Sequence, residues 1–175
     1  MQIQKFKTLN STNQKAKELA RKGAEPWTII LTEEQSAGYG KEKVPWFSPK
    51  GGLYFSIILP KSTIEDLQTL TVLAAFIVAK VIKENFSLEP LIKLPNDVRL
   101  KEKKVAGILT ENIIGKEVKV SIIGIGLNTN IDRLPRDLED IATSLKIELG
   151  KKVDNKKLLK EIVLGIKEQL KTISQ

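Results

Sequence analysis

Apolar positions in the early part of the chain change their spacing several times, and each change predicts a new element. Residues 6–9 (Phe-Lys-Thr-Leu) predict a short opening strand. Ser11 or Thr12 then offers a helix N-cap, and apolar residues at helical spacing follow as far as Gly23, which is a good helix stop. The β-branched run 27–31 predicts a buried strand.

The later part of the chain repeats both patterns. We expect a strand over 53–59, a long helix from Ser62 or Thr63 to about Asn85, a strand over 91–94, a hairpin of strands 106–113 and 117–125 turning at Ile114 and Gly115, a short helix over 140–149 and a final amphipathic helix from Asn155 to about Ile173. This order of elements predicts an α+β fold: a mostly antiparallel, mixed sheet with helices packed on one side.

The segment 33–50 interrupts this pattern, because its glycines, prolines and lysines show almost no periodicity. A long irregular connection in a compact domain is usually a functional loop or disordered. Trp46 and Phe47 argue against disorder, since disordered linkers are poor in aromatic residues. We therefore expect a functional loop here.

The stretch 92–109 carries the first sign of a ligand site. Short apolar runs flank a charged tip at residues 101–103, which predicts a hairpin. Pro95 breaks the preceding strand and displays the polar side chains that follow it. Lys104 and the bare Gly107 lie on the returning strand, and these groups together would suit an anionic ligand. A lysine-rich surface hairpin with an ordinary Pro-Asn turn explains the same residues, so both interpretations stay open at this point.

The chain contains no cysteine and no histidine. A disulfide framework and a thiolate metal site are therefore excluded, and the commonest general base is absent. Any chemistry must work through carboxylates, lysines, backbone amides and bound ions. With 175 residues, of which 41% are hydrophobic and 29% charged, the chain fits a single globular domain.

A formal net charge of +8 raises the question of nucleic-acid binding. The lysines are scattered over the whole length and mixed with glutamates, which is typical of a solvated surface, and no DNA- or RNA-binding motif is visible. No apolar stretch is long enough for a signal peptide at the N-terminus or for a membrane span. We therefore expect a cytoplasmic protein that binds neither nucleic acid nor a membrane.

Five motifs, in matching order and spacing, resemble the catalytic domain of biotin protein ligases over nearly the whole chain. They are Ser11-Thr-Asn13 after the first strand, Gln35-Ser-Ala-Gly-Tyr-Gly-Lys with Trp46-Phe-Ser-Pro, Lys93-Leu-Pro-Asn-Asp with Lys104-Val-Ala-Gly, Gly124-Ile-Gly-Leu-Asn128, and Ala142-Thr-Ser-Leu145. We therefore expect residues 1–175 to form one such domain, with neither the N-terminal DNA-binding domain nor the C-terminal β-barrel domain of longer members.

The resemblance implies an ATP-dependent ligation in two steps. The carboxylate of biotin attacks the α-phosphorus of ATP, with Mg²⁺ assistance, to give biotinyl-5′-adenylate and pyrophosphate. A lysine on the biotin carboxyl carrier domain of a carboxylase then takes the acyl group. Fixed positive charge and backbone N–H donors can supply most of this catalysis, which suits a histidine-free protein. Two alternatives remain: lipoate or octanoate transfer to a carrier domain, and a non-catalytic biotin-binding module.

The resemblance also implies a role for each matching residue. Lys104, between the carboxylate of biotin and the α-phosphate, is the expected catalytic residue, together with Lys41 of the loop. The expected biotin-binding residues are Ser11, Thr12, Asn13, Gln35, Gly38, Tyr39, Gly40, Lys41, Lys104 and Gly107. The expected ATP-binding residues are Trp46, Lys93, Asn96, Asp97 and Asn128, and Asp97 is also the candidate ligand for Mg²⁺.

Simpler roles would explain some of these residues equally well. Helix capping would account for Ser11 and Thr12, and it is compatible with ligand binding. Core packing would account for Trp46, and a turn for Asp97.

The ligand loop departs from the family pattern Gly-Arg-Gly-Arg-x-Gly-Arg-x-Trp. Tyr39 replaces the first arginine, Lys41 keeps only the charge of the second, and Val44 replaces the last. Lys43 stands at the place of the third glycine, where close backbone approach to a phosphate is then less favourable. We expect weaker or slower handling of the adenylate, or an altered ligand set. The family often pairs through its sheet, which leaves a homodimer open.

Overall fold

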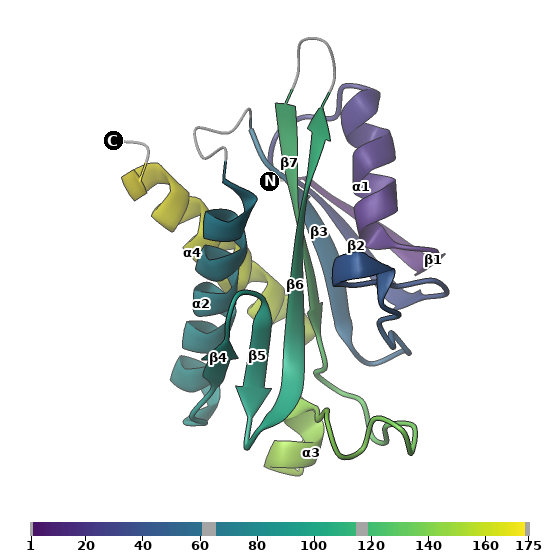
Figure 1. Cartoon of the computed structure of the whole chain (residues 1–175), viewed down its shortest axis with the longest axis vertical. Coiled ribbons are helices and arrows are strands. Elements are labelled where there is room, and N and C mark those ends of the chain that lie inside the picture. Colours follow the sequence, from purple (N-terminus) through teal and green to yellow (C-terminus); the bar gives the residue numbers. More distant parts are fainter. Residues whose placement is uncertain (1, 61–65, 115–118, 174–175) are drawn as a thin grey trace.

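A seven-stranded sheet forms the centre of the protein, of which the computed structural model describes residues 2–60, 66–114 and 119–173 (Figure 1). The strands are β1 (Gln2–Leu9), β2 (Thr28–Gln35), β3 (Leu53–Ile58), β4 (Leu91–Lys93), β5 (Asp97–Leu100), β6 (Lys103–Ile114) and β7 (Lys119–Leu127). Their order across the sheet is β1-β2-β3-β7-β6-β5-β4. The β1–β2 pair is parallel, and the other neighbouring pairs are antiparallel. The predicted α+β class with a mostly antiparallel, mixed sheet is confirmed.

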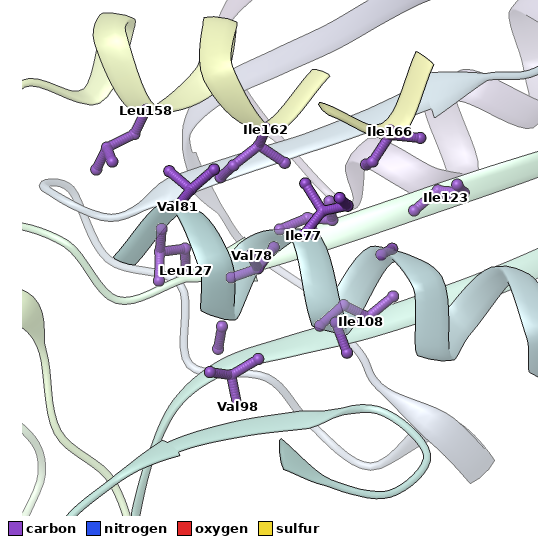
Figure 2. Close-up of a cluster of buried hydrophobic side chains, with 14 of the residues drawn as sticks. Ile77, Val78, Val81, Val98, Ile108, Ile123, Leu127, Leu158, Ile162 and Ile166 are labelled. Carbon is purple, nitrogen blue, oxygen red and sulfur yellow. The ribbon is translucent and has the colours of Figure 1, made fainter. Parts of the chain in front are cut away.

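Two long helices cover one face of the sheet and bury the main core. α2 (Leu67–Phe86) packs against α4 (Asn155–Ile173), and Figure 2 shows apolar side chains of both helices meeting those of the strands. The two helices approach closely at Gly165, where a Cβ would lie 2.9 Å from the Ile77 side chain. In the described part of the chain, no helix combines the length and the apolar character needed to cross a membrane.

The opposite face of the sheet is covered by α1 (Thr12–Arg21). A second, smaller cluster of buried side chains lies between them, made of Ala16, Ile30, Ile58 and Ile122. The expectation that the helices pack on one side therefore holds for α2 and α4 and needs correction for α1. Successive strand residues point to opposite faces, so β2, β3 and β7 carry apolar side chains on both faces and both require cover.

A side-chain cap determines where α2 begins. The Asp66 carboxylate accepts hydrogen bonds from two backbone amides of the first turn, at 3.0 and 2.9 Å. The predicted caps Ser62 and Thr63 lie outside the described residues. The helix ends at Phe86, one residue beyond the predicted end.

The helix predicted over 140–149 is shorter in the structure. α3 spans Leu145–Leu149, and the Ser144 hydroxyl caps it by accepting a backbone hydrogen bond at 3.1 Å. The preceding segment 141–143 is instead paired with Lys104 through two backbone hydrogen bonds of 2.9 Å. This pairing holds the segment in an extended form and brings it beside the candidate catalytic lysine.

The hairpin predicted within 92–109 is confirmed by the antiparallel pairing of β5 and β6. Lys101 and Glu102 at its tip have φ angles of 47° and 66°, as a type I′ turn requires. The second predicted hairpin is confirmed by the antiparallel pairing of β6 and β7, although Gly115 of the predicted turn and residue 117, the predicted start of the second strand, lie outside the described residues.

Candidate active site

A cavity of about 400 Å³ opens on the face of the sheet that α1 covers. Its walls come from the start of α1, the loop 39–47, strands β6 and β7, and residues of the segment 134–142. Every predicted site residue lines it except Gly38 and Lys93. Gly38 lies behind the wall, where a Cβ would come within 2.9 Å of neighbouring side-chain and backbone atoms, and Lys93 is exposed on β4.

One end of the cavity is built from polar side chains that bond to one another. Asn13 accepts a hydrogen bond from the Ser56 hydroxyl (2.6 Å) and donates to a β6 carbonyl (3.2 Å). Gln35 accepts from the backbone amide of Thr12 (2.8 Å) and donates to the Ser48 hydroxyl (2.9 Å). Most of the hydrogen-bonding capacity of these groups is therefore used within the protein, and they fix the shape of this end.

Ser11 occupies the N-cap position of α1 but its side chain makes no capping hydrogen bond. It is only 4% exposed, and both Ser11 and Tyr39 line the cavity. The structure thus places Ser11 in the cavity wall, beside the loop, and not in the capping role that its position alone would suggest.

Glu111 of β6 joins the polar end of the cavity to the loop. Its carboxylate accepts hydrogen bonds from the Asn13 side-chain amide (2.9 Å), the Tyr39 hydroxyl (3.1 Å) and the Lys17 ammonium (2.5 Å). Burial alone would raise the pKa of the Glu111 carboxyl, but these donors outweigh it and lower that pKa. Burial, and then the charge of Glu111, raise the pKa of Tyr39 to about 12. Glu111 therefore stays a charged acceptor, and Tyr39 a neutral donor, over a wide range of pH.

The loop predicted from its lack of periodicity folds back on itself as a small hairpin. The Gly40 amide donates to the Val44 carbonyl (2.8 Å), and the Trp46 amide donates to the Gly38 carbonyl (2.9 Å). The tip residues 42 and 43 have φ angles of 56° and 63°. Residue 43 is where the family pattern has glycine, and the left-handed backbone gives the physical reason for that preference.

Trp46 forms the floor of the cavity. Its indole lies against Gly107 and Gly126, which face each other on β6 and β7. A Cβ would come within 3.1 Å of the ring at Gly107 and within 2.4 Å at Gly126. The room expected beside Gly107 is thus occupied by Trp46 itself. Among the residues that the structure describes, the buried indole Nε1 finds no hydrogen-bond partner, which is costly unless a ligand supplies one.

Lys104 lies at the centre of the site, where β5 and β6 meet the loop. Its ammonium is 2.7 Å from the Asp97 carboxylate and 4.9 Å from the centroid of the Trp46 ring. The side chain is 27% exposed, so the ammonium is held in place yet remains accessible from the cavity. A positive charge fixed in this way can stabilise negative charge on a bound ligand.

Asn96 and Asn128 also line the cavity that contains Lys104. Asn96 donates only a long hydrogen bond to the Ile108 carbonyl, at 3.4 Å. Asn128 donates to the Thr143 carbonyl (3.0 Å), and its buried Oδ1 has no partner within the described ranges of the chain. Lys41, by contrast, is exposed at the rim, 3.9 Å from the adjacent Glu42 carboxylate.

Sequence reasoning missed Glu111, Ser56 and the wall segment 134–141. Ser56 is a lone polar residue between the apolar residues 55 and 57, which is a signal that could have identified it, whereas Glu111 stands between Thr110 and Asn112 and has no such signal. The apolar wall residues Leu134, Leu138 and Ile141 carry no such signal, because an irregular segment has no periodicity to interpret.

The position of Lys104 indicates what class of protein this is. Lys104 shares one cavity with a rigid polar end and with the Trp46 Nε1 and Asn128 Oδ1 atoms, which have no partner among the described residues. Such a cavity suits two ligands whose reacting groups meet at one ammonium, as in ligases that activate a carboxylate with a nucleotide. The Biotin/lipoate A/B protein ligase family matches residues 5–128, and the chain belongs to this family.

Two relatives and one solved structure show how far the similarity extends. The bifunctional ligase/repressor BirA of Bacillus subtilis is 38% identical over 161 residues, covering 89% of this chain and 50% of that protein. The biotin–[acetyl-CoA-carboxylase] ligase of Paracoccus denitrificans is 34% identical over 125 residues, covering 68% of this chain and 51% of that protein. The biotin protein ligase of Aquifex aeolicus, solved with biotin and ATP, is 32% identical with a TM-score of 0.88, and the match covers 97% of this chain and 70% of that one. The chain therefore spans about half the length of the curated relatives it matches.

Proposed function

We propose that the protein catalyses ATP-dependent biotinylation of the acceptor lysine of a biotin carboxyl carrier domain, through biotinyl-5′-AMP. The observation that carries this proposal is the Lys104 ammonium, which lies 2.7 Å from the Asp97 carboxylate and 4.9 Å from the centroid of the Trp46 ring in the same cavity that the polar side chains of Asn13, Gln35 and Asn128 line. The names of the relatives, a biotin–[acetyl-CoA-carboxylase] ligase among them, support biotin as the substrate.

In the first step the biotin carboxylate attacks the α-phosphorus of ATP. A carboxylate oxygen forms the new O–P bond, and pyrophosphate leaves with the electrons of the broken P–O bond. Both reactants are anionic, so Lys104 would draw them together and stabilise the charge on the phosphate oxygens in the transition state. To do so its ammonium must exchange part of its contact with Asp97 for the ligands.

In the second step the neutral amine of the acceptor lysine attacks the acyl carbon of the adenylate. A C–N bond forms, the C–O bond to AMP breaks, and the amine releases a proton to solvent. Trp46 would lie under the nucleotide, with Nε1 and the Asn128 Oδ1 available to its polar groups. The biotin head group would occupy the end shaped by Thr12, Asn13 and Gln35.

The protein offers only a limited site for Mg²⁺. In the described residues, no group of three carboxylates comes together as a metal site, and the Asp97 carboxylate is already paired with Lys104. A single carboxylate fits an ion that is bound mainly by substrate phosphates. Mg²⁺ would supply charge neutralisation on the triphosphate, and Asp97 is the residue that would hold it.

The carrier domain would dock at the mouth of the cavity. Exposed lysines at positions 41, 43 and 93 and exposed apolar side chains of Val44 and Leu94 lie in the segments around it. A basic rim suits an acidic carrier surface, so we expect the second step to slow as salt is raised while the first step changes less. The supply of ATP and of an acceptor carboxylase fits the cytoplasmic location that the sequence predicts. Pairing into a homodimer remains a prediction that sedimentation velocity can test.

One experiment separates this proposal from its alternatives. The protein is incubated with ATP, Mg²⁺, biotin and an apo carrier domain, and the carrier is weighed by mass spectrometry. Addition of one biotinyl group supports the ligase. Biotin binding by calorimetry without any addition to the carrier would reject it in favour of a binding module, and addition of a lipoyl or octanoyl group in a parallel reaction would favour the lipoate branch.

A further inference from the structure

The hairpin of residues 38–46 covers the cavity but has few hydrogen bonds that tie its outer half to the rest of the protein. Lys41, Glu42 and Lys43 at the tip are exposed, and the ion pair between Lys41 and Glu42 (3.9 Å) is local to the tip. The inner half is fixed through Ser48, which donates to the Trp46 carbonyl (3.0 Å). Tyr39 lies next to this base of the hairpin, where it pairs with Pro45, and its side chain reaches the body of the protein through its hydroxyl.

The acceptor of the Tyr39 hydroxyl is itself held rigidly. Glu111 lies in the centre of the sheet on β6, and Lys17 and Asn13 of α1 bind its carboxylate from the other side. Lys17 and Glu111 are each 20% exposed in their side chains, so their ion pair is largely shielded from solvent. A charged acceptor fixed by two donors is a firm anchor for a third.

The Tyr39 ring is also covered on the solvent side. The Lys43 ammonium lies 4.2 Å from the centroid of the ring, across the hairpin. This contact joins the tip of the hairpin to the ring, so movement of Tyr39 and movement of the tip are coupled.

We propose that Tyr39 and Glu111 form a latch that keeps this hairpin closed over the cavity, and that Tyr39 is thereby a positioning residue for the ligand beneath it. The family pattern has an arginine at the position of Tyr39. In this protein the neutral Tyr39 hydroxyl reaches across to Glu111 on β6 instead. Opening of the hairpin would break the Tyr39–Glu111 hydrogen bond, so the latch should slow the release of a ligand bound beneath it. Identification of that ligand as biotin rests on the proposed function, whereas the latch itself does not.

The latch can be tested in the free protein by amide hydrogen exchange. The Gly40 and Trp46 amides are bonded across the hairpin and report its opening. In Tyr39→Phe we expect both amides to exchange about tenfold faster, the loss expected for one hydrogen bond to a charged group. Unchanged exchange at both amides would overturn the latch.

Two further variants separate the latch from a general loss of stability. Tyr54→Phe removes the other tyrosine hydroxyl, which donates to the Pro49 carbonyl (3.0 Å), and should change exchange at Gly40 by less than about threefold. Glu111→Gln should accelerate exchange, and the double variant with Tyr39→Phe should be no faster than Tyr39→Phe alone. Effects that multiply in the double variant would show that the two residues act independently, contrary to the proposal.

The positioning role is tested by ligand release. Stopped-flow measurement should show biotin leaving Tyr39→Phe about tenfold faster, with the KM for biotin raised and the kcat of adenylate formation changed less than about threefold. Unchanged release would reject the positioning role. A protein that fails to bind biotin would contradict the proposed function, and the exchange measurements would still decide the latch.

Discussion

The two ends of the cavity use polar residues in opposite ways. At the end next to α1, the buried side chains of Thr12, Asn13 and Ser56 are bonded mostly to one another. At the other end, the buried polar atoms of Trp46 and Asn128 have no partner in the described parts of the chain. The first end is complete without a ligand, whereas the second is not.

This difference changes how the predicted site residues are understood. Residues at the complete end determine the shape of the cavity, so their substitution should first lower the free energy of unfolding. Residues at the incomplete end should be felt first in ligand binding or catalysis, because they contribute little to the protein alone. Lys104, whose ammonium contacts Asp97 and lies near the Trp46 ring, belongs to the second group.

The largest effect is expected from Lys104→Ala. Removing the central ammonium should slow adenylate formation about 10³-fold, while the free energy of unfolding changes by less than about 2 kcal/mol. Pyrophosphate release and urea denaturation measure the two quantities. Lys103→Ala is the matched control, since that ammonium bonds the Glu139 carbonyl and faces away from the cavity, and it should change the rate by less than about threefold. Substantial activity in Lys104→Ala would show that another group is the catalytic one.

Asn13→Ala should produce the largest loss of stability among the cavity residues. It removes the bonds to Ser56, to a β6 carbonyl and to Glu111 from a side chain that is 4% exposed. We expect a loss of about 3 kcal/mol by urea denaturation. Asn10→Ala, which loses an exposed bond to Ser36, should cost less than about 0.5 kcal/mol. Equal effects of the two variants would contradict the idea of a self-supporting end.

Trp46→Phe probes the incomplete end. It deletes the Nε1 atom, which has no partner among the described residues, and keeps an aromatic ring packed on Gly107 and Gly126. The KM for ATP should rise about tenfold, with a change in the free energy of unfolding of less than about 1.5 kcal/mol. Trp27→Phe replaces the other tryptophan, which is outside the cavity, and should leave the KM unaltered. A loss of stability without a change in the KM for ATP would show that Trp46 serves the fold and not ATP binding.

The smallest effect concerns the pH dependence of stability at Glu111. Because its folded-state pKa is lowered from the ordinary 4.5, the carboxylate stabilises the fold fully above that value. This contribution is lost as the pH falls below 4.5 and through the lower folded-state pKa. The difference in unfolding free energy between the wild type and Glu111→Gln should be largest near pH 7 and should shrink as the pH falls below 4.5. A difference that grows on acidification would reverse the assigned sign.

Much of the fold could be predicted from the sequence, because alternation and β-branched runs identify strands such as 53–59 reliably. The boundaries were harder where side-chain caps or bridges decide them, as with Asp66 at α2 and the pairing of 141–143 with Lys104. The placement of α1 on the opposite face was not predicted. Alternation shows that a strand has two apolar faces, but not which helix covers each of them.

The candidate site was predicted mainly by resemblance, which supplied Lys104, Asp97 and Trp46 together. What the sequence could not give is how each polar atom is used. The sequence does not distinguish Asn13 from Asn128. The side-chain nitrogen and oxygen of Asn13 are both hydrogen-bonded, whereas the Oδ1 of Asn128 has no partner in the described part of the chain. Such differences depend on contacts between residues far apart in the chain.

The packing of Trp46 on Gly107 and Gly126 makes activity depend on the correct pairing of two strands of the sheet. Gly107 and Gly126 face each other only in the observed pairing of β6 with β7. A shift of one residue in either strand would turn a neighbouring isoleucine, Ile108 or Ile125, toward the indole and leave no room for the ring. A misregistered molecule would therefore lack the ligand site altogether instead of working slowly. The fraction of active molecules in a refolded sample should therefore equal the fraction of chains in which β6 and β7 are correctly paired.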